Sequence, residues 1–277
     1  MNVHVLADAA TTTFSIFSVS SVVVFFARLR LDERILDSPA EIAKQFDVQG
    51  RLVTVETIGS GNVNDTYRVI FRTTFDEQQI VLQRINQAVF PSPQKVMSNI
   101  QSITAHAREK ILAEADEADR IWQLPKVIQT SAGTNHVTDG SGEVWRALSM
   151  IASAKSHERV VSSEHAVEAG QVLGHFQRLI ADFPVAQLED TLPGFHITPE
   201  YLARYDMTLQ MPDGKGRANA SSEAKRLTKF VEERREFASV LEDAVAQGEL
   251  QHRPIHGEPK ISSIMIDGFS GKGAARF

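Results

Sequence analysis

The stretch LVTVETIGSGNVNDTYRVIF, residues 52–71, decides the fold of this chain. Apolar and polar residues alternate over 52–58, then a glycine-containing turn follows at 59–62, and the alternation resumes over 66–71. Two alternating runs joined by such a turn are typical of a β-hairpin. The hairpin should turn two sets of apolar side chains toward a core: Val53 with Val55, and Tyr67 with Val69 and Phe71.

Further strands are predicted on both sides of a long helical segment. Residues 80–85 form a third apolar run, and a second hairpin is expected from 135–138 and 144–151 around the turn Asp-Gly-Ser-Gly at 139–142. These segments predict a five-stranded antiparallel sheet.

Two helices accompany the sheet. Ser38-Pro39 is typical of a helix start, and this helix should run through Phe46 and close near Gly50. Ser92-Pro93 begins a longer helix, whose apolar residues recur at helical spacing: Val96, Ile100, Ile103, Ala107 and Ile111.

After residue 151 the pattern becomes helical. Apolar residues recur at helical spacing over 163–181 and again over 222–247, whereas 182–222 resembles a long loop with a polar, mobile end. A sheet followed by helices predicts an α+β fold of two lobes, and small-molecule sites tend to lie between such lobes.

Composition limits the possible functions. The 277 residues are 42% hydrophobic and 23% charged, which is an ordinary globular balance. A net charge of −6 argues against a dedicated nucleic-acid binder, because no broad basic surface is available for phosphates. The absence of cysteine excludes disulfides, thiolate zinc sites and cysteine nucleophiles, and it is compatible with a reducing compartment.

Residues 14–27 form an apolar stretch with no Lys or Arg before it. Its 14 residues are fewer than the roughly 20 that a spanning helix needs. A secretory signal needs a positive start, which is absent here. We therefore expect a buried or poorly ordered extension; a membrane-touching anchor is the weaker alternative.

Three segments carry residues suited to phosphate chemistry. The turn at 59–62 contains Gly59, Gly61 and Asn62, and glycines allow backbone N–H groups to approach phosphate oxygens. On local grounds alone it is more typical of an ordinary hairpin turn. The third strand ends in Gln83-Arg84, where a cation could meet phosphates, although a strand-end arginine needs no function.

The third segment is the run HGEPKISS at 256–263, which enters an apolar strand. Gly257 and Pro259 fix a loop in which the acid Glu258 can face a cleft. An acidic residue in such a loop is more often structural than catalytic.

Taken together, these residues resemble the aminoglycoside phosphotransferase/choline kinase superfamily, and within it the N-acetylhexosamine 1-kinase-like branch. The resemblance covers most of 52–267 and rests on five strings: GSGNVNDTYRV, IVLQRINQAVFPSPQKVMSNI, VWRALSMI, GQVLGHFQRLIADFP and LEDTLPGFHITP. It implies a protein-kinase-like fold with a nucleotide-binding lobe at 36–151 and a helical lobe at 152–277, while residues 1–35 lie outside it.

The same resemblance implies transfer of phosphate from ATP, with Mg²⁺, to a hydroxyl of a sugar-like molecule in the cytoplasm. Gly59, Gly61 and Asn62 would cover the phosphates, and either Gln83 or Arg84 would stand at the position of the phosphate-binding cation. The remaining roles would fall to a hinge at Met150 and Ile151, a bracing His256, a catalytic base at Glu258 and a metal ligand at Ser263.

Three departures from the family pattern bear on activity. The family has Asp at the position of Glu258 and Asn at the position of Ser263. Its second metal-binding Asp motif would follow the last residue here, so the resemblance implies an incomplete helical lobe. The sequence thus leaves two functions open, an impaired sugar kinase and a catalytically inactive pseudokinase with at most weak nucleotide binding.

Overall fold

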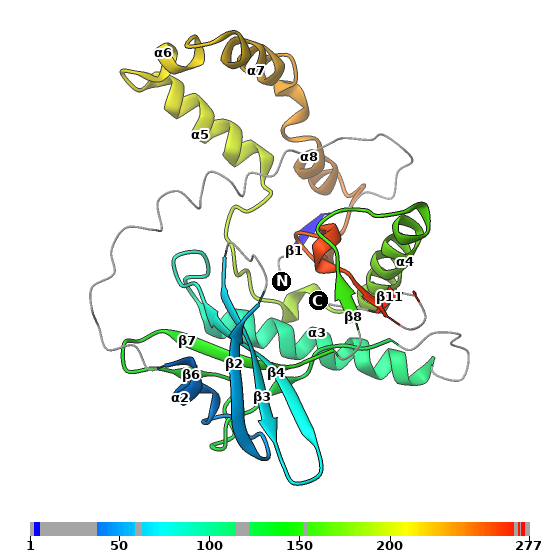
Figure 1. Ribbon diagram of the computed structural model, residues 1–277. Helices are drawn as coiled ribbons and strands as arrows, with labels where there is room; N and C mark the ends of the chain where they lie inside the picture. Colours follow the sequence, from blue (N-terminus) through cyan, green and yellow to red (C-terminus); the bar gives the residue numbers. More distant parts are fainter. Residues whose placement is uncertain are drawn as a thin grey trace. The chain divides into compact units, whose positions relative to one another are not determined.

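A computed structural model describes residues 3–5, 38–58, 63–114, 122–151, 154–268, 271 and 273–274. It divides into two compact units, one formed by Thr13–Thr191 and Pro254–Phe277 with the first two residues, the other by Val3–Thr12 and Leu192–Arg253. The described part is a mixed α+β structure (Figure 1). The division into lobes at residue 151 stays a prediction.

The first unit is built on an antiparallel sheet with the strand order β2-β3-β4-β7-β5, and β6 also pairs with β7. The five predicted strands are confirmed, and a short sixth one, β5, was not predicted. Their bounds are β2 Arg51–Thr57, β3 Asp65–Arg72, β4 Glu77–Ile85, β5 Val127–Ile128, β6 Val137–Thr138 and β7 Val144–Ser149.

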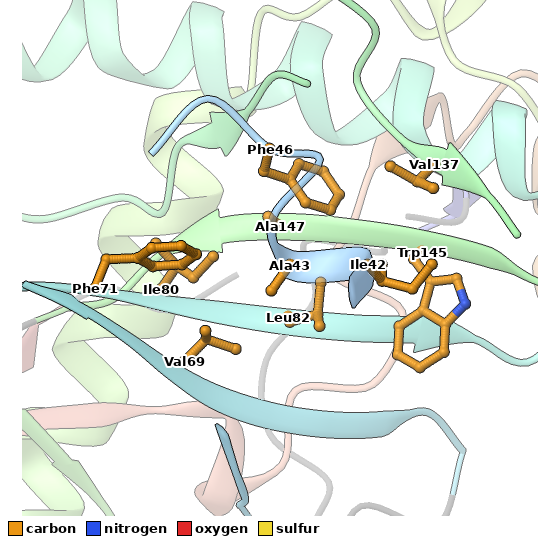
Figure 2. Close-up of a cluster of buried hydrophobic side chains, with 10 residues drawn as sticks. All are labelled: Ile42, Ala43, Phe46, Val69, Phe71, Ile80, Leu82, Val137, Trp145 and Ala147. Atoms are coloured by element: carbon orange, nitrogen blue, oxygen red, sulfur yellow. The ribbon is translucent and has the colours of Figure 1, made fainter. Parts of the chain in front are cut away.

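One face of this sheet, here called the α2 face, packs against the short helix α2, Pro39–Ala43. Ser38 caps that helix as predicted, but the helix ends three residues before Phe46. Figure 2 shows the apolar core between them, in which Ile42, Ile80 and Leu82 are fully buried. Burial of such side chains is the main force that holds a sheet to a helix.

The prediction that Val53 and Val55 lie on the same face of the first strand is wrong. The pairing of β2 with β3 shifts register between Leu52 and Thr54, so that Leu52 and Val55 pack against the core while Val53 is exposed. A bulge adds one residue to one strand and so reverses the alternation of side chains beyond it. Tyr67, Val69 and Phe71 share the core as predicted.

The opposite face, here called the α3 face, meets the long helix α3, Pro93–Ala113. Met97 and Ile100 of α3 pack against Ile85 and Val144 of the sheet. Helix α4, Ser163–Ile180, in turn packs on α3 through a cluster that includes Ile103 and Phe176. A 3-10 turn, η2 Val185–Gln187, follows α4.

The first unit also contains a small second sheet. Its strands are β8 Ala154–Ser156, β10 Met265–Asp267 and β11 Gly273–Ala274, in the antiparallel order β11-β10-β8. A 3-10 turn, η4 Ile261–Ser263, comes directly before β10.

The second unit contains helices α5 Thr198–Gln210, α6 Gly214–Ala218, α7 Ser222–Glu232 and α8 Val240–Ala246, with the 3-10 turn η3 Arg235–Phe237. The prediction of a loop over 182–222 is wrong here. Pro199 lies in the first turn of α5, and the twelve-residue run after it, up to Met211, contains neither Gly nor Pro. Two short strands, β1 Val3–Val5 and β9 His252–Pro254, pair with each other.

The single helix predicted for 222–247 is also wrong, because α7 and α8 are separated by η3. Arg235 of η3 donates hydrogen bonds of 2.8 and 2.9 Å to both carboxylate oxygens of Asp206. The expected apolar face is not buried either, since Phe237 is 68% exposed. Without burial, periodicity alone does not keep a helix continuous.

Within the described residues, no helix is both long and apolar enough to cross a membrane. The apolar stretch 14–27 lies outside those residues.

Candidate functional site

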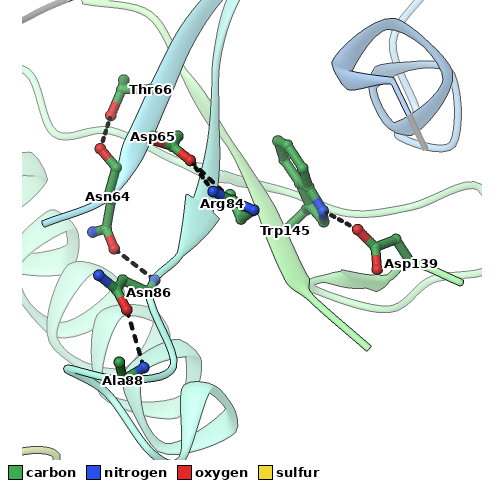
Figure 3. Close-up of polar contacts among 8 residues, drawn as sticks. All are labelled: Asn64, Asp65, Thr66, Arg84, Asn86, Ala88, Asp139 and Trp145. Carbon is green, nitrogen blue, oxygen red and sulfur yellow. Dashed lines mark hydrogen bonds and ion pairs between the residues drawn. The ribbon is translucent and has the colours of Figure 1, made fainter. Parts of the chain in front are cut away.

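The predicted phosphate turn, with Gly59, Gly61 and Asn62, lies outside the described residues, but both of its flanks are described. The Ile58 N–H donates to the Thr66 carbonyl at 2.9 Å, which closes the hairpin. The Asn64 side chain accepts from the Asn86 N–H at 3.0 Å and so ties the turn to the end of β4 (Figure 3). The segment leading to α3 is fixed in the same way, because the Asn86 side chain accepts from the Ala88 N–H.

The sheet register separates Gln83 from Arg84. Arg84 lies opposite Asp65 on β3 and Trp145 on β7, in line with the α2 face. Its guanidinium forms an ion pair with Asp65 through two nitrogens, with Nε 2.9 Å from Oδ2. Figure 3 shows that pair. Arg84 therefore already has a carboxylate partner.

Gln83 points the other way, to the α3 face. Its register partners are Thr66 on β3 and Arg146 on β7. The Gln83 Nε2 donates to the Thr66 hydroxyl at 3.0 Å, and its Oε1 accepts from the Arg146 Nε at 3.0 Å. Thr66, Gln83 and Arg146 thus form one line of hydrogen-bonded side chains across three strands, here called the polar row.

Arg146 is a residue that the sequence analysis missed. It is partly buried, and burial lowers the pKa of its guanidinium to about 10. It is still charged at neutral pH, because that value remains far above 7. No carboxylate of the described residues lies within ion-pair distance of it. In the sequence, the sign of this placement was that Arg146 stands between two apolar residues, Trp145 and Ala147, both of which are buried in the structure.

Met150 and Ile151 follow β7 directly. The Met150 N–H donates to the Gln79 carbonyl at 3.4 Å, the last contact of this strand with β4, and Ile151 is buried. The next described segment is β8, so the predicted hinge connects the large sheet with the small one. Residues 152–153 lie outside the described part.

The loop 256–263 is held between α4 and the small sheet. Gly257 has a φ of 85°, a left-handed conformation that favours glycine. The Lys260 N–H donates to the Glu258 carbonyl at 2.9 Å, and the Ser263 N–H donates to the Lys260 carbonyl at 2.9 Å. These bonds fold the loop into a compact turn with the Glu258 residue exposed.

His256 packs edge-on against Phe176 of α4, with ring centroids 5.9 Å apart. Burial lowers the pKa of this imidazole, and the nearby Glu258 opposes that change only in part. Its Nδ1 is buried and has no hydrogen-bond partner in the described structure. His256 is therefore neutral at pH 7 and suited to bracing the loop rather than to carrying charge.

The hinge and the loop meet through β8 and β10. Met265 pairs with Ser156, and Asp267 pairs with Ala154. Two predicted site segments more than 100 residues apart in the sequence are thereby joined to neighbouring strands. Ile264, just after Ser263, is buried with Ala169 and Val172 of α4, which anchors the loop's end.

The described residues provide no preformed cluster of metal ligands. Mg²⁺ takes oxygen ligands in an octahedral arrangement and usually needs one or two carboxylates. Nowhere in the described ranges do three or more His, Asp or Glu side chains gather closely enough to hold a metal. Ser263 alone is a poor substitute.

A shallow depression of about 560 Å³ lies elsewhere, beside α2 and β6. Thr130, Thr134 and His136 are among its lining residues, and none of the predicted site residues lines it. Its location does not coincide with the polar row or the loop. Comparison of the chain with models of known protein families found no match.

Proposed function

We propose that this chain is a kinase-like ATP-dependent phosphotransferase acting on a hydroxyl of a sugar-like molecule, with impaired activity. The β8–β10 pair carries this proposal, because it ties the hinge segment predicted to meet adenine to the loop predicted to hold the catalytic base. The polar row supports it further, since it lines up a cation and an amide on the face that α3 also contacts. The resemblance assigns the cover of the phosphates to the turn at 59–62, which lies outside the described residues.

In the reaction, the acceptor oxygen forms a bond to the γ-phosphorus while the bond from that phosphorus to the β–γ bridging oxygen breaks. The hydroxyl proton passes to the Glu258 carboxylate, and ADP leaves with the bridging oxygen. Positioning and charge neutralisation supply most of the acceleration in such transfers. His256, neutral and packed on Phe176, holds the loop in place.

Two features limit the rate. Glu258 is one methylene longer than the aspartate of the related enzymes, which moves the carboxylate by roughly 1 Å and costs on the order of 100-fold. The described residues also provide no cluster for a metal, so the charge on the γ-phosphate is left largely to cationic side chains.

The second candidate is a protein that binds ATP without transferring phosphate. The observation that favours it is the same lack of a metal-binding cluster in the described part. ADP release with ATP and a panel of hexosamines and hexoses separates the two. Slow, sugar-dependent ADP formation that Glu258→Gln abolishes supports transfer, whereas ATP binding without it supports the second candidate. A chain that neither binds ATP nor forms ADP contradicts both.

The variant Glu258→Asp tests the limits on rate. We expect its turnover to stay far below about 1 per second, the low end of typical kinases. The aspartate restores the distance between the base and the acceptor hydroxyl, but the charge on the γ-phosphate is still not neutralised. Because the base and the charge-neutralising groups act as a unit, repairing one of them recovers little activity. Turnover near that value would show that another group in the chain holds a metal.

A further inference from the structure

The polar row contains a cation without an anion. Among the described residues, the Arg146 guanidinium has one side-chain hydrogen bond, from Nε to the neutral Gln83 amide oxygen at 3.0 Å. On the same face, two residues along β3 from Thr66, Arg68 is paired with the carboxylate of Glu56. The sheet therefore neutralises one arginine of this face and leaves its neighbour unneutralised.

Such an arrangement is costly for the fold alone. A charge that is removed from water loses solvation, and the loss is recovered only by an opposite charge or by a full set of hydrogen bonds. Burial lowers the pKa of Arg146 but does not neutralise it. Because the side chain keeps some exposure, an anion from solution can supply the missing interactions.

We propose that Arg146, oriented by Gln83, is the cation that receives the phosphate oxygens of the bound nucleotide. This inference rests on the proposed function and assigns the role that the sequence left open between Gln83 and Arg84. Gln83 occupies the strand position of the cation, and the charge comes from its register partner on β7. A guanidinium offers a planar fork of donors that suits phosphate better than an amide does.

Gln83 also positions this fork. Its amide accepts from the Arg146 Nε and donates to the Thr66 hydroxyl, so its orientation is fixed from both sides. With Nε thus occupied, the two terminal nitrogens of the guanidinium are left for a ligand. Thr66 belongs to the strand that follows the turn at 59–62, which connects the polar row to the predicted phosphate loop.

The test uses Gln83→Glu, a nearly isosteric change that places a carboxylate against Arg146. The internal ion pair should keep or raise the melting temperature, because the Thr66 hydroxyl can donate as well as accept. The new carboxylate also repels phosphate, and its ion pair with Arg146 keeps the guanidinium from binding a ligand. We therefore expect the affinity for ATP and for inorganic tripolyphosphate, measured by calorimetry on the full chain, to fall at least about tenfold. Gln78→Glu, the same change at an exposed position of β4, is the matched control and should bind like the original chain.

The outcomes separate this inference from the proposed function. If the original chain and Gln83→Glu bind ATP equally, the assignment of Arg146 is wrong while nucleotide binding stands. A third outcome is that the original chain binds tripolyphosphate but not ATP, and that Gln83→Glu weakens the binding of tripolyphosphate. The anion site is then supported, and the nucleotide is not its ligand. If the original chain binds neither, both fail.

Arg146→Lys provides a second route if Gln83→Glu does not fold. Lysine keeps the charge but loses the fork, so ATP affinity should fall by about three- to tenfold, a smaller loss than that caused by removing the charge. Unchanged affinity in a folded Arg146→Lys variant would overturn the assignment.

Discussion

At the scale of single residues, Asp139 shows how much one side chain can fix. Its Oδ1 accepts from the Ser141 and Glu143 N–H groups, both at 2.9 Å. Its Oδ2 accepts from the Trp145 indole at 2.9 Å, the bond drawn in Figure 3. The carboxylate therefore sets the turn between β6 and β7 and satisfies a buried indole. It thereby holds in place the strand that carries Arg146.

Asp139 predicts a pH-dependent stability. Burial by itself would raise the pKa of Asp139, but hydrogen bonds from Ser141, Trp145 and Glu143 outweigh it and hold the pKa below its ordinary value. A lowered folded pKa contributes stability above the unfolded value of about 4, and this contribution is lost as the pH falls through the folded pKa. Asp139→Asn should cost about 1–3 kcal/mol at pH 7, because one acceptor becomes a donor facing N–H groups.

Urea unfolding of the original chain and of Asp139→Asn, at pH 7 and near pH 3, measures the stability that the Asp139 carboxylate contributes. The difference in unfolding free energy between them should shrink at the lower pH, because the original carboxylate then begins to take up a proton. A difference that is the same at both pH values would contradict the role of the charge.

At the scale of elements, one amide side chain of α3 binds the backbone of the chain that follows α4. Asn99 of α3 is fully buried. Its Nδ2 donates to the Glu189 carbonyl at 2.7 Å, and its Oδ1 accepts from the Glu189 N–H at 2.8 Å. The side chain thus replaces the backbone partners that an irregular segment lacks.

Asn99→Leu should destabilise the protein by about 2–4 kcal/mol, because it removes both hydrogen bonds between the buried Asn99 amide and the Glu189 backbone. Thermal or urea unfolding measures the loss. Ser98→Ala, at an exposed position of the same helix, is the control and should change stability by less than about 0.5 kcal/mol. An equal effect of the two variants would mean that the Asn99 contacts do not hold α3 in place.

The elements also show what a sequence can predict. Local signals, such as Pro at the first turn of α2 and α3 and alternation in β3, were sufficient for those elements. The sequence was not sufficient where an element depends on contacts with residues far away in the chain. The break between α7 and α8 accompanies the contact of Arg235 with Asp206, 29 residues away.

The candidate site divides in the same way. The hairpin could be predicted, since it is a local pattern, whereas the roles of the hinge at Met150 and Ile151 and of the loop 256–263 stay predictions. The choice between Gln83 and Arg84 could not be predicted, because it depends on the pairing of β4 with β3 and β7. Arg146 was missed because its partner Gln83 is 63 residues away.

At the scale of the whole molecule, the two units differ in how much they bury. The first unit contains every hydrophobic cluster of the described residues. In the second, helices α5, α7 and α8 contain no buried residue, and large apolar side chains are exposed: Met207, Met211, Leu227, Phe230, Phe237, Val240 and Leu241.

Regions with few buried apolar contacts open at low free energy. Native-state hydrogen exchange should therefore find the amides of α5 and α7 exchanging at least about 100-fold faster than those of β4 and β7. Limited proteolysis should first cut within Leu192–Arg253. Equal protection in both sets of elements would contradict this difference between the units.

We expect the chain to bind ATP through side-chain cations and not through a metal clamp. Titration of the full chain with ATP by calorimetry, with and without Mg²⁺, tests it most directly. We predict measurable but weak binding, which Mg²⁺ strengthens by less than about threefold, because the described residues provide no metal-binding cluster. Absence of ATP binding, or a large strengthening by Mg²⁺, would contradict the account.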